Sequence, residues 1–105
     1  MTSFNLLDAF ERNFKRLSKK YKTLKDDFEK FQRVLRNVPC GVGKNFTIIH
    51  SEPAYKIIKA RMACRALRDR SLRVVYAHME EGDRFYFIEI YFKGEQVNEN
   101  KHLIF

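Results

Sequence analysis

The residues of this chain best suited to phosphate chemistry are four cations in its second half, Lys59, Arg61, Arg65 and Arg73. The first three occupy odd positions in the stretch from Tyr55 to Ala66, where most even positions are apolar. Apolar residues at every second position are typical of a β-strand with one buried face. Arg73 has the same place in the next alternation, from Leu72 to Met79. The spacing predicts that all four project from one solvent-facing side of a β-sheet, which suits RNA or DNA.

The stretch from Arg84 to Lys93 predicts a third strand of this sheet, because it alternates in the same way. Its even positions are expected to face the core, and they are Tyr86, Ile88, Ile90 and Phe92. The other face adds Glu89, Tyr91 and Lys93 to the polar surface. Together the three strands predict a buried set of Ile58, Met62, Val74, Ile88 and Ile90. We expect Tyr91 and Lys93 to contact nucleic acid beside the cations.

The first forty residues predict two helices joined by a short link. Each opens with capping-box spacing, Asp8 with Glu11 in the first and Thr23 with Asp26 in the second. The first is expected from about Ala9 to Tyr21, and the second is expected to end before Pro39. Phe4 to Leu7 and Phe46 to His50 have the composition of further short strands. The predicted fold is α+β, with an N-terminal α-helical hairpin packed on one face of a small antiparallel β-sheet.

Composition limits the possible classes of protein. A chain of 105 residues predicts a single domain over residues 1–105, and its net charge of +8 predicts an acidic partner. No segment has the pattern of a signal peptide or of a membrane span, so we expect a cytoplasmic protein without a membrane partner. Binding to a membrane surface through the first helix is disfavoured, because the core needs its apolar stripe. No cofactor or metal is expected, since the His and Cys residues lack ligand spacing.

The cationic face has the groups that RNA cleavage needs. One group must take a proton from a ribose 2′-OH, another must protonate the leaving oxygen, and cations must stabilise the charged phosphorane. Lys59 is a candidate base, and Glu89, Tyr91 and His102 are the other candidates for proton transfer. Lys19 and Lys20 belong to a basic run in the first helix and are expected to attract phosphate. A face that docks phosphate without any chemistry fits the pattern equally well.

Four segments in this order resemble motifs of the RelE/ParE superfamily of toxins from prokaryotic toxin-antitoxin pairs. The segments are Phe14 to Tyr21, Ile58 to Ala63, Leu72 to Ala77 and Phe87 to Lys93, and the likeness spans nearly the whole chain. The resemblance implies two helices on one face of an antiparallel sheet. RelE-like members cleave mRNA in the ribosomal A site, ParE-like members inhibit DNA gyrase, and an antitoxin neutralises both kinds. The implied partners are therefore a cognate antitoxin and the ribosome with its mRNA.

Carried over by motif, the resemblance implies catalytic roles for Lys59, Arg61 and Arg73. A second register would start the motif at Lys56, but alternation places that residue on the opposite side of the strand. We therefore prefer Lys59.

The tail departs from the family pattern, because Gly94 follows Lys93 where an Arg is common and no Tyr occurs after Tyr91. His102 is the one tail residue able to replace the missing proton-transfer group. The resemblance favours a ribosome-dependent mRNA endonuclease (an mRNA interferase). The departures favour the alternatives, a gyrase-inhibiting ParE-like toxin or an RNA-binding module with a degenerate site.

Overall fold

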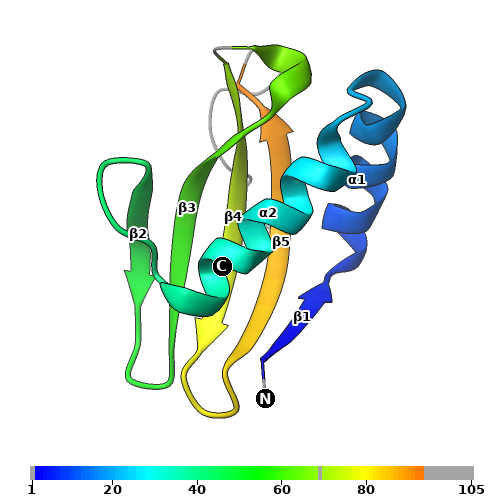
Figure 1. Ribbon diagram of the computed structural model, residues 1–105. Coiled ribbons are helices and arrows are strands. Elements are labelled where there is room, and N and C mark those ends of the chain that lie inside the picture. Colours follow the sequence, from blue (N-terminus) through cyan, green and yellow to red (C-terminus); the bar gives the residue numbers. More distant parts are fainter. Residues whose placement is uncertain (1, 69, 94–105) are drawn as a thin grey trace.

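The computed structural model describes residues 2–68 and 70–93, which form two helices and a five-stranded sheet (Figure 1). In chain order the elements are β1 (Ser3–Leu6), α1 (Asp8–Lys20), α2 (Leu24–Asn37), β2 (Phe46–Ser51), β3 (Tyr55–Ala63), the 3-10 helix η1 (Arg65–Leu67), β4 (Ser71–Met79) and β5 (Arg84–Phe92). The strand order is β1-β5-β4-β3-β2, and β1 is parallel to β5 while the other neighbours are antiparallel. The predicted α+β architecture is confirmed, with both short strands present. Neither described helix is long and apolar enough to cross a membrane.

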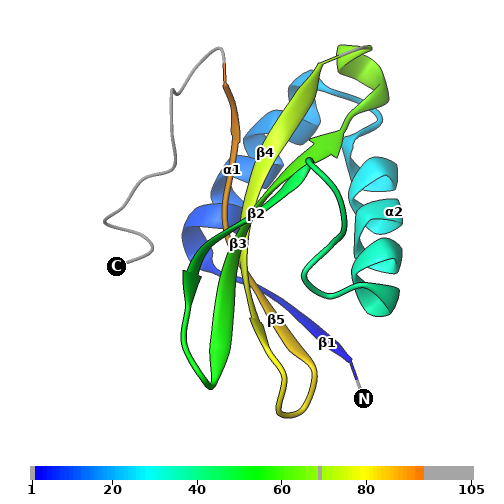
Figure 2. The same ribbon diagram turned by 90° about the vertical axis from the view of Figure 1, so that its left-hand side faces the viewer.

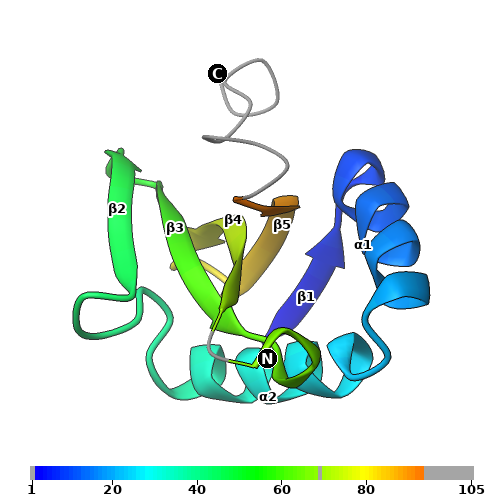
Figure 3. The same cartoon turned by 90° about the horizontal axis from the view of Figure 1, so that it is seen from above.

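Helix α2 lies on one side of the sheet (Figure 2), and buried residues of both helices form one core cluster with the sheet residues that face that side. Seen from above, the strands form a curved sheet, with α2 across its convex side and α1 beside β1 and β5 (Figure 3). Neither described helix covers the opposite side, which we call the concave face. The main core therefore lies on the helix side of the sheet.

Aromatic side chains of the helices hold them on the sheet. The ring of Phe28 packs edge-on against Phe87 with centroids 4.9 Å apart, and Phe10 lies 5.4 Å from the same ring. Ile58, Met62 and Val74 belong to this buried cluster, as the alternation predicts. The apolar residues of both segments recur every three or four positions, so a helix places them on one face. Burying each such side chain against the sheet contributes about 1.5–3 kcal/mol.

The pairing of β4 with β5 contains a bulge at Ile88. Val75 is opposite Glu89 and Tyr76 is opposite Phe87, so Ile88 is an extra residue on β5. A bulge of one residue inverts the alternation of faces along the strand that carries it.

The strict alternation predicted for β5 is therefore wrong in the first half of the strand. Phe85 and Phe87 belong to the core beneath the helices, where Tyr86 and Ile88 were expected. Ile88 is buried as predicted, but on the concave face beside Ile57. After the bulge the alternation follows the prediction again.

The helix starts differ in detail from the predicted capping boxes. Asp8 is the first residue of α1, and the preceding Leu7 makes no side-chain cap. Thr23 does precede α2, but its hydroxyl donates to Asp27 Oδ2 at 2.8 Å rather than accepting from the helix backbone. The start of α2 is thus held by a bond to Asp27, which also binds Arg65 just after β3.

The loop between α2 and β2 is tied to the core. The hydroxyl of Tyr76 donates to the carbonyl of Pro39 at 2.8 Å. Gly41 follows with φ +70°, and a Cβ at this position would clash with the ring of Phe46. Phe46 in turn stacks on Phe31 with centroids 6.2 Å apart. The loop therefore requires glycine here both for its backbone angle and for its close contact.

We predict that Gly41→Ala destabilises the protein more than Gly43→Ala. Both positions have positive φ, which costs an alanine about 1–2 kcal/mol. Only Gly41 also has Phe46 against it, and this overpacking adds about 1–3 kcal/mol. Urea unfolding at neutral pH measures the difference, and equal free energies of unfolding for the two variants would contradict the role of this contact.

Candidate nucleic-acid interface

A row of three polar side chains crosses the concave face. Arg61 of β3 is directly opposite Arg73 of β4, and Arg73 is opposite Tyr91 of β5. Directly opposed residues of antiparallel strands have Cα atoms about 4.5–5.5 Å apart and side chains on the same face. The prediction that Arg61 and Arg73 share one side of the sheet is confirmed.

The guanidinium of Arg73 is held in place by the start of its own strand. Its Nη1 donates to Ser71 Oγ at 2.8 Å and to the Ser71 carbonyl at 3.3 Å. These bonds turn the side chain toward the end of the sheet where β4 begins. Because both acceptors are neutral, these bonds orient the guanidinium without neutralising its charge.

Arg61 and Arg73 place two like charges opposite each other, which costs stability in a sheet. Within residues 2–68 and 70–93, no ion pair joins either of them to a carboxylate. Arg61 is exposed and Arg73 is half-buried. A bound phosphate would relieve their repulsion, since a guanidinium can donate two parallel hydrogen bonds to phosphate oxygens.

Lys59 lies in the adjacent row of the concave face. It is opposite Val75, and Val75 is opposite Glu89. The Cα atoms of Lys59 and Glu89 are thus two strand spacings apart, or about 10 Å. Lys59 is half-buried, whereas Glu89 is only 2% exposed. The predicted trio of Lys59, Arg61 and Arg73 therefore occupies neighbouring positions on one face.

The concave face also has an apolar floor that the alternation did not predict. Ile57, Val75, Ile88 and Tyr91 form a buried cluster there. Tyr91 has the predicted orientation but is only 4% exposed. Its ring therefore belongs mainly to the floor, and the cations stand beside an apolar surface.

Arg65 does not belong to the concave face, so its predicted placement is wrong. Strand β3 ends at Ala63, and Arg65 begins η1. Its Nε donates to Asp27 Oδ1 at 3.0 Å, and its backbone N–H donates to Asp27 Oδ2 at 3.0 Å. Its Nη2 also lies 3.6 Å from Asp26 Oδ2. The alternation ends with the strand, and the carboxylates of α2 hold the side chain on the helix side.

Asp27 remains ionised in this setting. Burial by itself would raise the pKa of its carboxyl, but hydrogen bonds from Thr23, from the Arg65 backbone and from the Arg65 guanidinium outweigh that effect. The net pKa lies below the usual value. The charged carboxylate therefore ties the end of β3 to the start of α2.

The remaining predicted residues are dispersed. Lys19 and Lys20 are exposed in the last turn of α1, in the helix layer rather than on the concave face. Lys93 is exposed directly after β5. His102 lies outside the described residues. From the helix layer, Lys19 and Lys20 can add only long-range attraction to a ligand on the concave face.

The alternative register at Lys56 is disfavoured by the pairing of the strands. Lys56 is opposite His78, which is buried among the helix-side residues. Lys56, His78 and Cys40 line one cavity below the end of α2. Lys59, not Lys56, therefore lies on the face that carries Arg61 and Arg73.

Two cations in the loops beside β4 and β2 are not among the predicted site residues. Arg70 lies over the ring of Phe92, 5.9 Å from its centroid, close to the start of β4. Lys44 precedes Asn45, whose carbonyl accepts the backbone N–H of Arg61 at 2.9 Å. Neither residue belongs to a periodic pattern, so only contacts between elements reveal them.

Comparisons with protein-family models, with curated proteins and with solved structures find no match for this chain. The concave face offers an oriented arginine, an exposed arginine and a lysine within neighbouring rows. Such an arrangement can hold one or more phosphate groups.

We predict that Asp27→Asn lowers the free energy of unfolding by about 2 kcal/mol at pH 7, because it weakens charge-assisted hydrogen bonds to a buried group. The folded pKa of Asp27 is depressed, so its stabilising effect is complete above the unfolded pKa of about 4 and is lost as pH falls through the folded value. The parent and the variant should therefore converge below pH 4.

Denaturant unfolding at several pH values tests this prediction. The matched control is Asp26→Asn, because that side chain is 73% exposed and should change stability by less than about 0.5 kcal/mol. A constant difference between parent and Asp27→Asn from pH 7 to pH 3 would show that the carboxylate charge is not the cause.

Proposed function

We propose that this protein is the toxin of a type II toxin-antitoxin system, an mRNA interferase that cleaves mRNA codons in the ribosomal A site. The observation that supports it is the direct opposition of Arg61 and Arg73 on a face that also carries Lys59. The proposed partners are the ribosome with its mRNA and a cognate antitoxin. The motif resemblance supports this specific activity, and the cations of the concave face support RNA binding.

The proposed reaction is a transfer within the RNA backbone. The ribose 2′-oxygen attacks the adjacent phosphorus, the bond to the 5′-oxygen breaks, and the products carry a 2′,3′-cyclic phosphate and a 5′-hydroxyl. Arg61 and Arg73 would stabilise the phosphorane, in which negative charge increases. Lys59 is the candidate to accept the 2′-hydroxyl proton, and His102 is the candidate for the second proton transfer.

A second candidate function is phosphate binding without cleavage, either as a gyrase inhibitor or as an RNA-binding module. The specific observation in its favour is that Glu89 and Tyr91 are 2% and 4% exposed. Two of the groups able to transfer a proton are thus shielded from a ligand on the concave face. In this case Arg61 and Arg73 would position a polyanion but break no bond.

We predict that the purified protein, added to a translating extract, produces cuts in mRNA at codons in the A site. Primer extension on a defined mRNA locates such cuts, and a reaction without ribosomes serves as the control. Slowed translation with intact mRNA would overturn cleavage and favour the non-cleaving alternative. Inhibition of purified gyrase would then separate the gyrase inhibitor from the RNA-binding module.

We also predict that expression without an antitoxin arrests growth and that Arg73→Ala relieves the arrest. Removing one group that stabilises the transition state should slow cleavage by about 10²–10³-fold. The fold should survive, because within residues 2–68 and 70–93 the Arg73 side chain bonds to its near neighbour Ser71 and to no distant segment.

The matched control is Lys15→Ala on α1, which removes one positive charge from a side chain that is 73% exposed. It should leave the arrest unchanged. Equal arrest by parent and Arg73→Ala, with circular dichroism showing a folded variant, would remove Arg73 from the proposed site.

A further inference from the structure

A groove of about 390 Å³ lies between α2 and the end of β3. Its floor is largely apolar and is formed by Phe31, Val34, Phe46 and Met62. The groove is open because β2 pairs with β3 only as far as Ala60, so the last residues of β3 extend beyond their neighbour.

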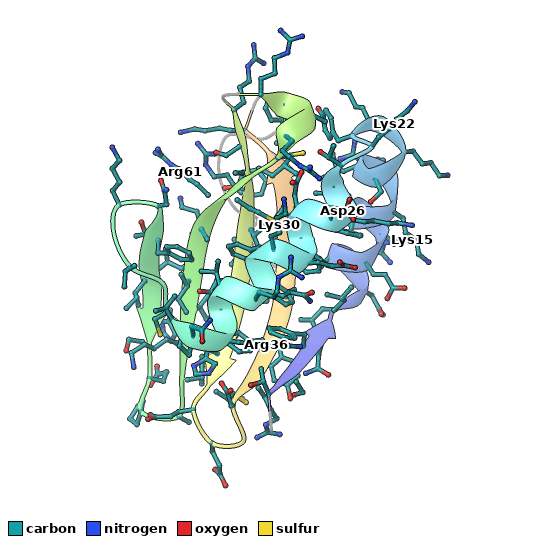
Figure 4. The ribbon with its side chains drawn as sticks, viewed as in Figure 1. Lys15, Lys22, Asp26, Lys30, Arg36 and Arg61 are labelled. Carbon is teal, nitrogen blue, oxygen red and sulfur yellow. The ribbon has the colours of Figure 1, made fainter. Side chains whose placement is uncertain are left out.

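Three cations surround this apolar floor, and they are Lys30, Arg61 and Arg65. Among the described residues the one carboxylate lining the groove is that of Asp27, which is already bonded to Arg65. Lys30 projects from α2, and Arg61 projects beside the end of β3 (Figure 4). An apolar floor with a positive rim is complementary to a ligand that carries both an apolar surface and negative charge.

The aromatic part of the floor is preorganised. Phe31 and Phe46 are stacked with centroids 6.2 Å apart and planes 3° from parallel. Phe46 is held on another side by the close approach of Gly41. Phe46 and Val34 both remain partly exposed. A planar ligand can therefore be received without reordering the side chains.

Arg61 belongs both to this groove and to the row on the concave face. Arg61 is thus the residue that the groove shares with the proposed phosphate-binding surface. Successive groups of one polyanionic chain can occupy both surfaces, with Arg61 between them.

We propose that this groove receives a base of single-stranded RNA whose flanking phosphates contact Arg61 and the concave face. The inference rests on the RNA binding of the proposed function and adds a base-binding subsite to it. An acidic peptide would also meet the three cations, but the partly exposed ring of Phe46, backed by the buried ring of Phe31, is the kind of surface on which bases stack without sequence preference. Base binding here would restrain the strand as its phosphates lie against Arg73.

The test is fluorescence anisotropy with a labelled single-stranded RNA of ten nucleotides at low salt. Val34→Glu places a carboxylate on the groove floor and should raise Kd about 10-fold, the size expected for losing one stacked base. The matched control is Ile48→Glu, because Val34 and Ile48 are 46% and 49% exposed and the change in charge is the same. Ile48→Glu should change Kd by less than about twofold, since it lies outside the groove.

An RNA of equal length without bases separates stacking from phosphate attraction. The parent and Ile48→Glu should prefer the normal RNA by about 10-fold, and Val34→Glu should lose this preference. Equal binding of both RNAs by the parent, or equal Kd values for the two variants, would overturn the subsite. A polyglutamate peptide that competes fully with RNA in the parent and not in Val34→Glu, without any base preference, would assign the groove to a peptide instead.

Failure of the subsite is distinguishable from failure of the proposed function. If Arg73→Ala weakens RNA binding while Val34→Glu does not, the groove proposal fails and the concave face stands. If the parent shows base-dependent binding but cuts no mRNA, the subsite stands and the endonuclease assignment fails. If the parent binds no RNA, both are overturned.

Discussion

The hydrogen bonds of the buried Asp27 carboxylate hold together the end of the molecule where β3 ends and α2 begins. They join Thr23 at the start of α2 to the backbone and guanidinium of Arg65 just after β3. Because these bonds hold Arg65 on the helix side just after β3, the cations of this strand that face the concave side end at Arg61. The same bonds place α2 beside the free edge of β3 and so form one wall of the groove. Removing this charge should therefore alter both surfaces.

The two faces of the sheet have different physical constraints. The helix side is filled by aromatic rings, and its stability comes from apolar burial. The concave face combines a small apolar floor with opposed cations, an arrangement that costs energy in the free protein. The bulge at Ile88 shifts the alternation along β5, so that Phe87 faces the helices while Glu89 and Tyr91 lie on the concave face. The opposed cations thus lie on the side of the sheet away from the main core.

The net charge of +8 is divided between structural and available cations. Arg65 is bound to carboxylates, while Arg36 and Arg70 lie over the rings of Phe4 and Phe92. Among the described residues no ion pair joins Arg61 or Arg73 to a carboxylate, so their charge is available to a phosphate. Counting charges indicates a polyanionic partner, but the contacts decide where that partner can bind.

The sequence by itself determined the element order, the helical hairpin and the face occupied by Lys59, Arg61 and Arg73, because periods of 3.6 and 2 are local properties of helices and strands. It misplaced Arg65 and the first half of β5, and it missed Arg70 and the groove. These features depend on where a strand ends, where an extra residue enters a ladder and which side chain reaches a distant partner. Such choices are settled by packing and hydrogen bonding between segments far apart in the chain, so only the tertiary structure decides them.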